Sequence, residues 1–87
     1  MTKLDALDAA ARGEGCLGRS AADEPVFVLV ARDRTASAAV RAWAARARAA
    51  ALAAGEPLRE EKYAEALAVA NEMDVWRAAH GGGKLPD

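Results

Sequence analysis

The chain has 87 residues, which bounds it to a single domain, and its one cysteine, Cys16, excludes an internal disulfide. Cys16 and His80 are the only Cys and His residues, so the sequence predicts neither a zinc site nor another cofactor. The formal net charge of −1 provides no overall field toward nucleic acid or a membrane surface, and we expect neither as a partner.

The first predicted element is a short helix within residues 1–13. Thr2 can cap its start and Gly13 can end it, while Leu4 and Leu7 are its large apolar side chains. Two large side chains give so short a helix little area to bury, so it is marginal unless it packs on the rest of the chain. Whether this helix belongs to the core stays open at this point.

Residues 25–32 hold the only convincing strand pattern, after a glycine-rich stretch, residues 13–24, that is typical of an irregular loop. Pro25 opens the strand, and the next residues are apolar on both alternations, which favours a strand covered on both faces. A lone strand leaves its backbone donors and acceptors without partners. We therefore expect it to pair with a second copy across a homodimer, or with a short flanking segment.

Two long helices are predicted next, over residues 36–54 and 58–80. Gly55 ends the first, Pro57 suits the first turn of the second, and residues 81–87 form a flexible tail. Helices joined by so short a connection form an antiparallel hairpin. The predicted fold class is therefore mainly α with one β-strand: a short helix, a loop, the strand and then the helical hairpin.

Apolar residues outside the expected hairpin contact predict a surface for another chain. Val69 and Trp76, seven residues apart, share a face beside the inner stripe of the second long helix. Alanine supplies much of the 53% hydrophobic content, so the core of so small a chain is modest and oligomerisation is favoured. The predicted interface residues are Val26, Val28, Val30, Val69 and Trp76.

A row of arginines suggests an anion site. Arg34, Arg41 and Arg48 are spaced by seven and line one side of the first long helix. Such a row beside a helix start can hold phosphate through charge-assisted hydrogen bonds. The alternative is that these arginines are solvated or pair with the acidic second helix. The predicted anion-binding residues are Arg19, Arg32, Arg34, Arg41 and Lys84.

No catalytic constellation is visible, so the sequence predicts a non-enzymatic protein. Cys16 has Arg19 nearby but no positioned base, which a nucleophile requires. The glycines of residues 81–83 precede a lysine, yet the hydroxyl residue and following helix of a phosphate-binding loop are missing. Trp43 and Trp76 could stack on a nucleobase, but their positions on helical stripes favour packing.

Several short motifs carry a resemblance to a known group of proteins. They are Cys16-Leu17-Gly18-Arg19, the run from Asp23 to Leu29, Val40-Arg41-Ala42-Trp43-Ala44, Lys62-Tyr63-Ala64-Glu65-Ala66 and Lys84-Leu85-Pro86-Asp87. Together they resemble small accessory proteins encoded by tailed phages and prophages, over roughly residues 16–87. The resemblance implies a context, an accessory gene product acting on host defence or phage structure. It carries no residue roles.

The function predicted from this combination is a homo-oligomeric, non-enzymatic phage-type accessory protein. It would sequester a small anionic, nucleotide-like ligand in counter-defence. The alternative is a protein-interaction module, an inhibitor or small structural component that docks through its helical face. The start of the chain leads into a charged, alanine-rich helix and not an apolar run, so a cytoplasmic location in the host cell is expected.

Overall fold

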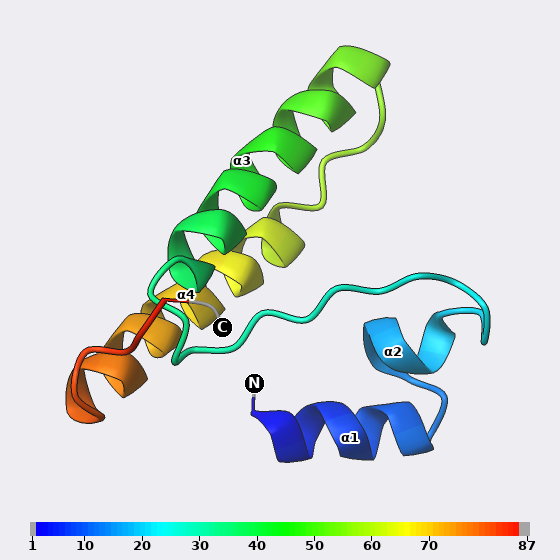
Figure 1. Ribbon diagram of the computed structural model, residues 1–87. Coiled ribbons are helices and arrows are strands. Elements are labelled where there is room, and N and C mark those ends of the chain that lie inside the picture. The colour runs from blue at the N-terminus through cyan, green and yellow to red at the C-terminus, as the bar shows by residue number, and fades with distance from the viewer. Residues whose placement is uncertain (1, 86–87) are drawn as a thin grey trace.

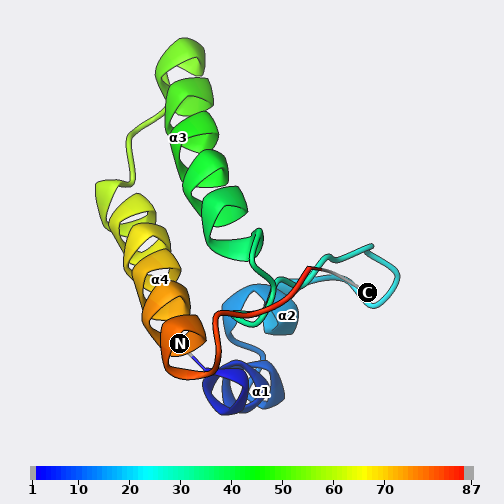
Figure 2. The same ribbon diagram turned by 60° about the vertical axis from the view of Figure 1, so that its left-hand side comes forward.

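The computed structural model describes residues 2–85, and within them it contains four α-helices and no β-strand. The helices are α1 (Lys3–Ala11), α2 (Gly15–Arg19), α3 (Ala36–Ala54) and α4 (Glu60–Ala79). The described part of the chain is divided into two helix pairs, because α1 contacts α2 and α3 contacts α4, but neither pair contacts the other through its helices. A drawn-out segment, residues 20–35, connects the pairs (Figures 1 and 2).

The first pair forms through local hydrogen bonds. The Thr2 hydroxyl accepts from the Asp5 amide at 3.2 Å, and the Asp5 carboxylate accepts from the Thr2 amide at 2.9 Å, a capping box that starts α1. The predicted cap is thus present. Residues 15–19, predicted as irregular loop, are instead the helix α2, and that prediction was wrong. A Cβ at Gly18 would lie 2.6 Å from the Gly13 carbonyl carbon, so glycine is what lets α2 fold against the end of α1.

The predicted β-strand over residues 25–32 is wrong. This segment belongs to no strand or sheet, and between Val26 and Leu29 no backbone hydrogen bond to any described residue is present. Pairing of this strand across a homodimer falls with it. An apolar alternation signals a preference for burial, but a strand also needs a second strand to accept its hydrogen bonds, and residues 2–85 supply none.

One isolated parallel bridge forms just beyond this segment, with the chain's own C-terminal end. The Arg34 amide donates to the Lys84 carbonyl at 2.9 Å, and the Lys84 amide donates to the Arg32 carbonyl at 2.9 Å. Gly83 allows this return, with φ of +76° and no room for a Cβ, which would lie 2.7 Å from the Arg32 carbonyl oxygen. The tail predicted to be flexible therefore turns back onto the chain as far as it is described. Met1, Pro86 and Asp87 lie outside the described residues.

The predicted helical hairpin is confirmed. The Asp33 carboxylate accepts from the Thr35 amide at 2.8 Å and from its hydroxyl at 2.7 Å just before α3, and Gly55 ends that helix. The α4 helix begins at Glu60, after the short connection. The buried residues are small, namely Ala36, Ser37, Ala44 and Ala70, and small side chains let two helices approach closely. None of the helices within residues 2–85 has the length and apolar character that a membrane span needs.

Candidate functional site

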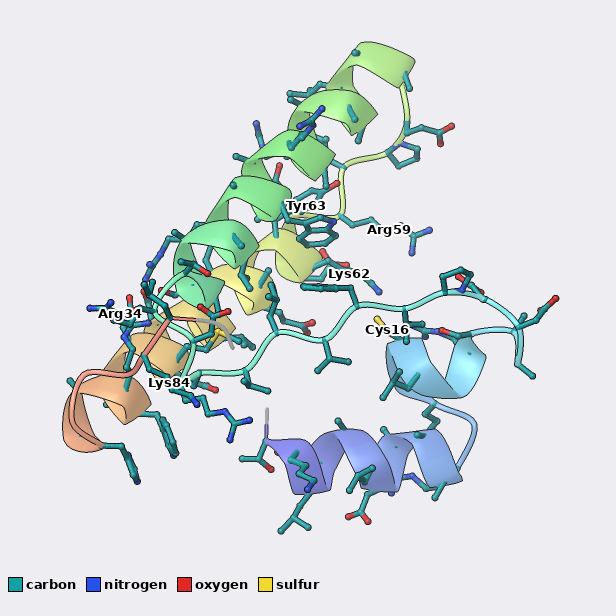
Figure 3. The ribbon with its side chains drawn as sticks, viewed as in Figure 1. Cys16, Arg34, Arg59, Lys62, Tyr63 and Lys84 are labelled. Carbon is teal, nitrogen blue, oxygen red and sulfur yellow. The ribbon has the colours of Figure 1, made fainter. Side chains whose placement is uncertain are left out.

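An open groove of about 1220 Å³ lies between the two helix pairs. One wall comes from α1 and α2, the other from one face of α4, and the drawn-out segment contributes Ser20 and residues 26–32 (Figure 3). The apolar side chains that line the groove come from residues 26–30, with Leu7, Leu17, Val69, Met73 and Trp76. The groove is therefore a surface assembled from three parts of the chain that helix packing does not hold together.

The drawn-out segment offers both apolar area and backbone groups. Phe27 is 87% exposed and Val28 is 66% exposed, although both line the groove. The amides and carbonyls between Val26 and Leu29 bond to no other described residue. Exposed apolar area on this scale is unfavourable in water, by about 25 cal/mol per Å². The segment is thus suited to being covered by a further molecule.

The α4 wall is built on a repeat of seven. Lys62, Val69 and Trp76 recur at that spacing, and all three line the groove. The Trp76 ring stacks on His80, with ring centroids 3.8 Å apart and planes 11° from parallel. His80 Nδ1 lies 2.7 Å from the Trp76 carbonyl oxygen, to which it can donate. These two contacts orient the indole at the C-terminal end of the wall.

The structure brings the five predicted interface residues together. Val26, Val28 and Val30 lie on the drawn-out segment, and Val69 and Trp76 lie on α4, all within the lining of the one groove. The helical period found the α4 pair, and the apolar run found the segment. The contributions of Leu7 and Leu17 were missed, because nothing in the sequence placed the first helix pair opposite α4.

The predicted anion-binding residues do not form a single site. Arg32, Arg34 and Lys84 lie close together because the backbone bridge joins them, and Figure 3 shows Arg34 and Lys84 at that end of the molecule. Arg41 instead faces α4, donating to Asp74 at 2.6 Å and to Asn71 at 2.9 Å. Arg19 lies on α2 and lines the groove.

The alternative reading of the arginine row, pairing with the acidic helix, holds for two of its members. Arg41 pairs with Asp74, and Arg48 pairs with Glu60 at 2.9 Å. Both pairs join α3 to α4. The opposite charge of the two helices, visible in the sequence, was the signal for this contact.

Asp74 is the centre of a polar cluster that sequence reasoning did not identify. It accepts from Arg41 and, at 2.7 Å, from Arg77, whose side chain is 19% exposed. The hydroxyl of buried Ser37 and then the Arg41 guanidinium lower the pKa of Asp74 to about 2. Arg77 also lies against Gly83, so the cluster joins both long helices to the returning C-terminal segment.

Among the described residues no three His, Cys, Asp or Glu side chains gather into a group that could hold a metal ion. Residues 81–84 form the return after α4 and precede no helix within the described range, unlike a phosphate-binding loop. Trp43 lies outside the groove lining, so the two tryptophans share no site there. Comparison with protein-family models, curated proteins and solved structures finds no match to this chain.

Proposed function

We propose that this chain is a non-enzymatic protein-interaction module and that the groove between its helix pairs is the docking surface. The observation that carries the proposal is the amount of surface that the folded chain leaves exposed. Because the sequence motifs resemble phage accessory proteins, we also propose that the module acts within a host or phage protein assembly.

The exposed surface is much larger than a compact chain of this mass requires. The described structure exposes 6658 Å² for a mass of 9.0 kDa, whereas the area expected for a folded monomer is about 4,900 Å². The excess, roughly 1,800 Å², is about twice the area that one partner buries in a standard protein interface. The radius of gyration agrees, at 14.3 Å against about 12 Å for a compact domain of this length.

About half of the large apolar side chains that the described residues expose line the groove, where a partner could cover them. No large side chain among the described residues is fully buried, so the chain alone has only an alanine core. The large apolar side chains of residues 26–30 line the groove instead, together with Leu7, Leu17, Val69, Met73 and Trp76. A partner seated there would supply the core that the chain lacks, which is how many small domains reach stability.

A photo-crosslinking experiment in cells tests this function. A benzophenone side chain in place of Phe27, which is 87% exposed in the groove, is expected to form protein adducts on irradiation. The same group in place of Leu52, exposed on α3 outside the groove, is the matched control and is expected to form few. Equal adduct yields at the two positions, or none at position 27, would contradict the proposal.

A second candidate function, binding of a small anion, is favoured by the backbone bridge, which brings Arg32, Arg34 and Lys84 close together in the fold. These cations and a nucleotide-like phosphate would attract each other through charge-assisted hydrogen bonds. The test is calorimetric titration with nucleotides. Arg34→Gln is expected to abolish binding, whereas Arg41→Gln, which removes a partner of Asp74, is expected to leave it unchanged.

A further inference from the structure

We infer that the occupant of the groove is a second copy of this chain, related by a twofold axis. Each copy would cover the groove of the other, so the working unit is a homodimer joined through side chains of α4 and the drawn-out segment. This inference rests on the proposed function and names the partner.

The first argument is the charge of the groove. Its lining carries cations and anions in nearly equal number: Lys3, Arg19, Arg32 and Lys62 against Glu14, Glu65 and Glu72. In a twofold interface the same patch meets itself, so a patch of one sign would repel its mate. A nearly neutral patch of mixed sign pairs with itself without that cost. A nucleic acid would require a basic lining, and a basic peptide would require an acidic one.

The second argument is the spacing of residues on α4. Val69 stands midway between Lys62 and Trp76, with seven residues to either side, and all three line the groove. If two α4 helices lie antiparallel with the twofold axis at Val69, each Lys62 is opposite the Trp76 of the other copy. An ammonium over an indole face is an attractive cation–π contact, and the symmetry forms it twice. The valines meet on the axis, and the apolar residues 26–30 of each copy flank this contact.

The third argument is size. The groove, at about 1220 Å³, is larger than the roughly 300–1,000 Å³ of a typical small-molecule pocket. The excess surface of roughly 1,800 Å² per chain gives a total for two copies within the 2,000–5,000 Å² range of obligate homodimers. A small ligand would fill only part of so large a groove, whereas a second copy could extend over the groove and over apolar surface beside it.

Sedimentation equilibrium of the purified chain, over low to high micromolar concentrations, tests the inference. The expected mass is twice the 9.0 kDa of the chain. Val69→Asp puts a carboxylate on the axis and is expected to give the monomer mass, with a dissociation constant raised at least tenfold. Val75→Asp is the matched control, because Val75 is on the same helix, 71% exposed and outside the groove, and its dimer is expected to persist. Circular dichroism of both variants checks that the hairpin stays helical.

Hydrogen exchange supplies the second readout. The helical amides of α4 around Val69 are expected to exchange more slowly in the wild-type dimer than in Val69→Asp, because opening of this helix in the dimer also requires the two copies to separate. A dimer in which they exchange as rapidly as in that variant uses another face, and the inference is overturned. It is also overturned by a wild-type monomer at high micromolar concentration. Crosslinks from position 27 to a different protein would then leave the proposed function standing and replace the partner.

Discussion

The two helix pairs are held by different kinds of interaction. The α3–α4 hairpin has buried alanines at its contact and ion pairs, Arg41–Asp74 and Arg48–Glu60, that cross from one helix to the other. The N-terminal arm, residues 2–32, has a capping box and a close approach at Gly18, all of them local in sequence. Local bonds are enough to form helices, but burial between distant segments is what fixes how helices sit together.

The two regions therefore differ in burial: the hairpin buries its contact residues within the chain, whereas the arm leaves its large apolar side chains exposed to a possible partner. The hairpin already pairs its opposite charges and buries its small residues. The arm contributes its large apolar side chains, Leu7 and Leu17 among them, to a groove instead of a core. We expect unfolding of the isolated chain to reflect the hairpin, with the arm opening at low cost.

The largest effect is expected from overpacking the hairpin contact. Ala70 is fully buried at the α3–α4 contact, and Ala70→Leu adds volume where the helices lie close together. We expect the free energy of unfolding to fall by up to about 3 kcal/mol, since inserted methylenes force backbone shifts. Thermal denaturation followed by circular dichroism measures it. Ala68→Leu, at an exposed position of the same helix, is the control, and we expect it to change the free energy of unfolding little. If Ala70→Leu changed the free energy of unfolding as little as Ala68→Leu does, the helices would not be closely packed at Ala70.

The hairpin was also the region that the sequence predicted best, because its signals are local and periodic. Gly55 sets the end of α3, and the apolar stripes of both helices required only the 3.6-residue period. The error over residues 25–32 has a definite cause. Strand formation depends on a distant partner, and periodicity reports a preference for burial without saying which element provides it. The helix α2 was missed because three glycines in a short stretch favour a loop, and only the packing of Gly18 on Gly13 shows why glycine is needed there.

The features of the site also differ in how far local sequence patterns predict them. The helical spacing of Val69 and Trp76 was sufficient to place both on one face of α4. The Arg41–Asp74 pair could be expected only in outline, from the opposite charge of two helices, because the register of a hairpin contact is not encoded by either helix alone. The convergence of Arg32 and Lys84 depends on a return of the chain that no local pattern announces.

The next prediction tests how tightly the returning C-terminal segment packs against the hairpin. A Cβ at Gly83 would lie 2.5 Å from Arg77 Cδ and 2.7 Å from the Arg32 carbonyl oxygen, at a φ of +76°. We expect Gly83→Ala to lower the free energy of unfolding by about 2 kcal/mol, through the left-handed backbone and the steric clash together. Gly82→Ala shares the positive φ, but its Cβ would have open space, so it isolates the backbone cost. Denaturant titration of both variants gives the difference, and equal losses would show that the return makes no tight contact.

The dependence of stability on pH tests the cluster around Asp74, which lies where α3 begins and α4 ends. The Ser37 hydroxyl, followed by Arg41, lowers the pKa of Asp74 from its ordinary value of 3.8 to about 2. A carboxyl whose folded pKa is depressed stabilises the fold above its unfolded pKa and loses that contribution as the pH falls through the folded value. We therefore expect Tm to drop by several degrees as the pH falls from about 4 toward about 2. Asp74→Asn should have a lower Tm than the wild type at neutral pH, and its Tm should fall less between about pH 4 and about pH 2. If its Tm fell as much as that of the wild type, other carboxyl groups would be responsible for the fall.

The smallest effect on stability is expected from removing the cap of α1 in the arm. This change tests most directly whether the arm and the hairpin are independent. The Thr2 hydroxyl accepts from the Asp5 amide at the start of α1, and Thr2→Ala removes that acceptor. A lost cap costs about 1 kcal/mol of local helix stability. Because no helix of the arm contacts the hairpin, amide exchange in α1 should rise about fivefold while the Tm of the hairpin stays unchanged. The comparison is cleanest in the Val69→Asp background, where the chain is expected to be monomeric. A shift of the hairpin's Tm in that background would show that the two regions are coupled within one chain, since the drawn-out segment is then the only path by which an altered cap could reach α4.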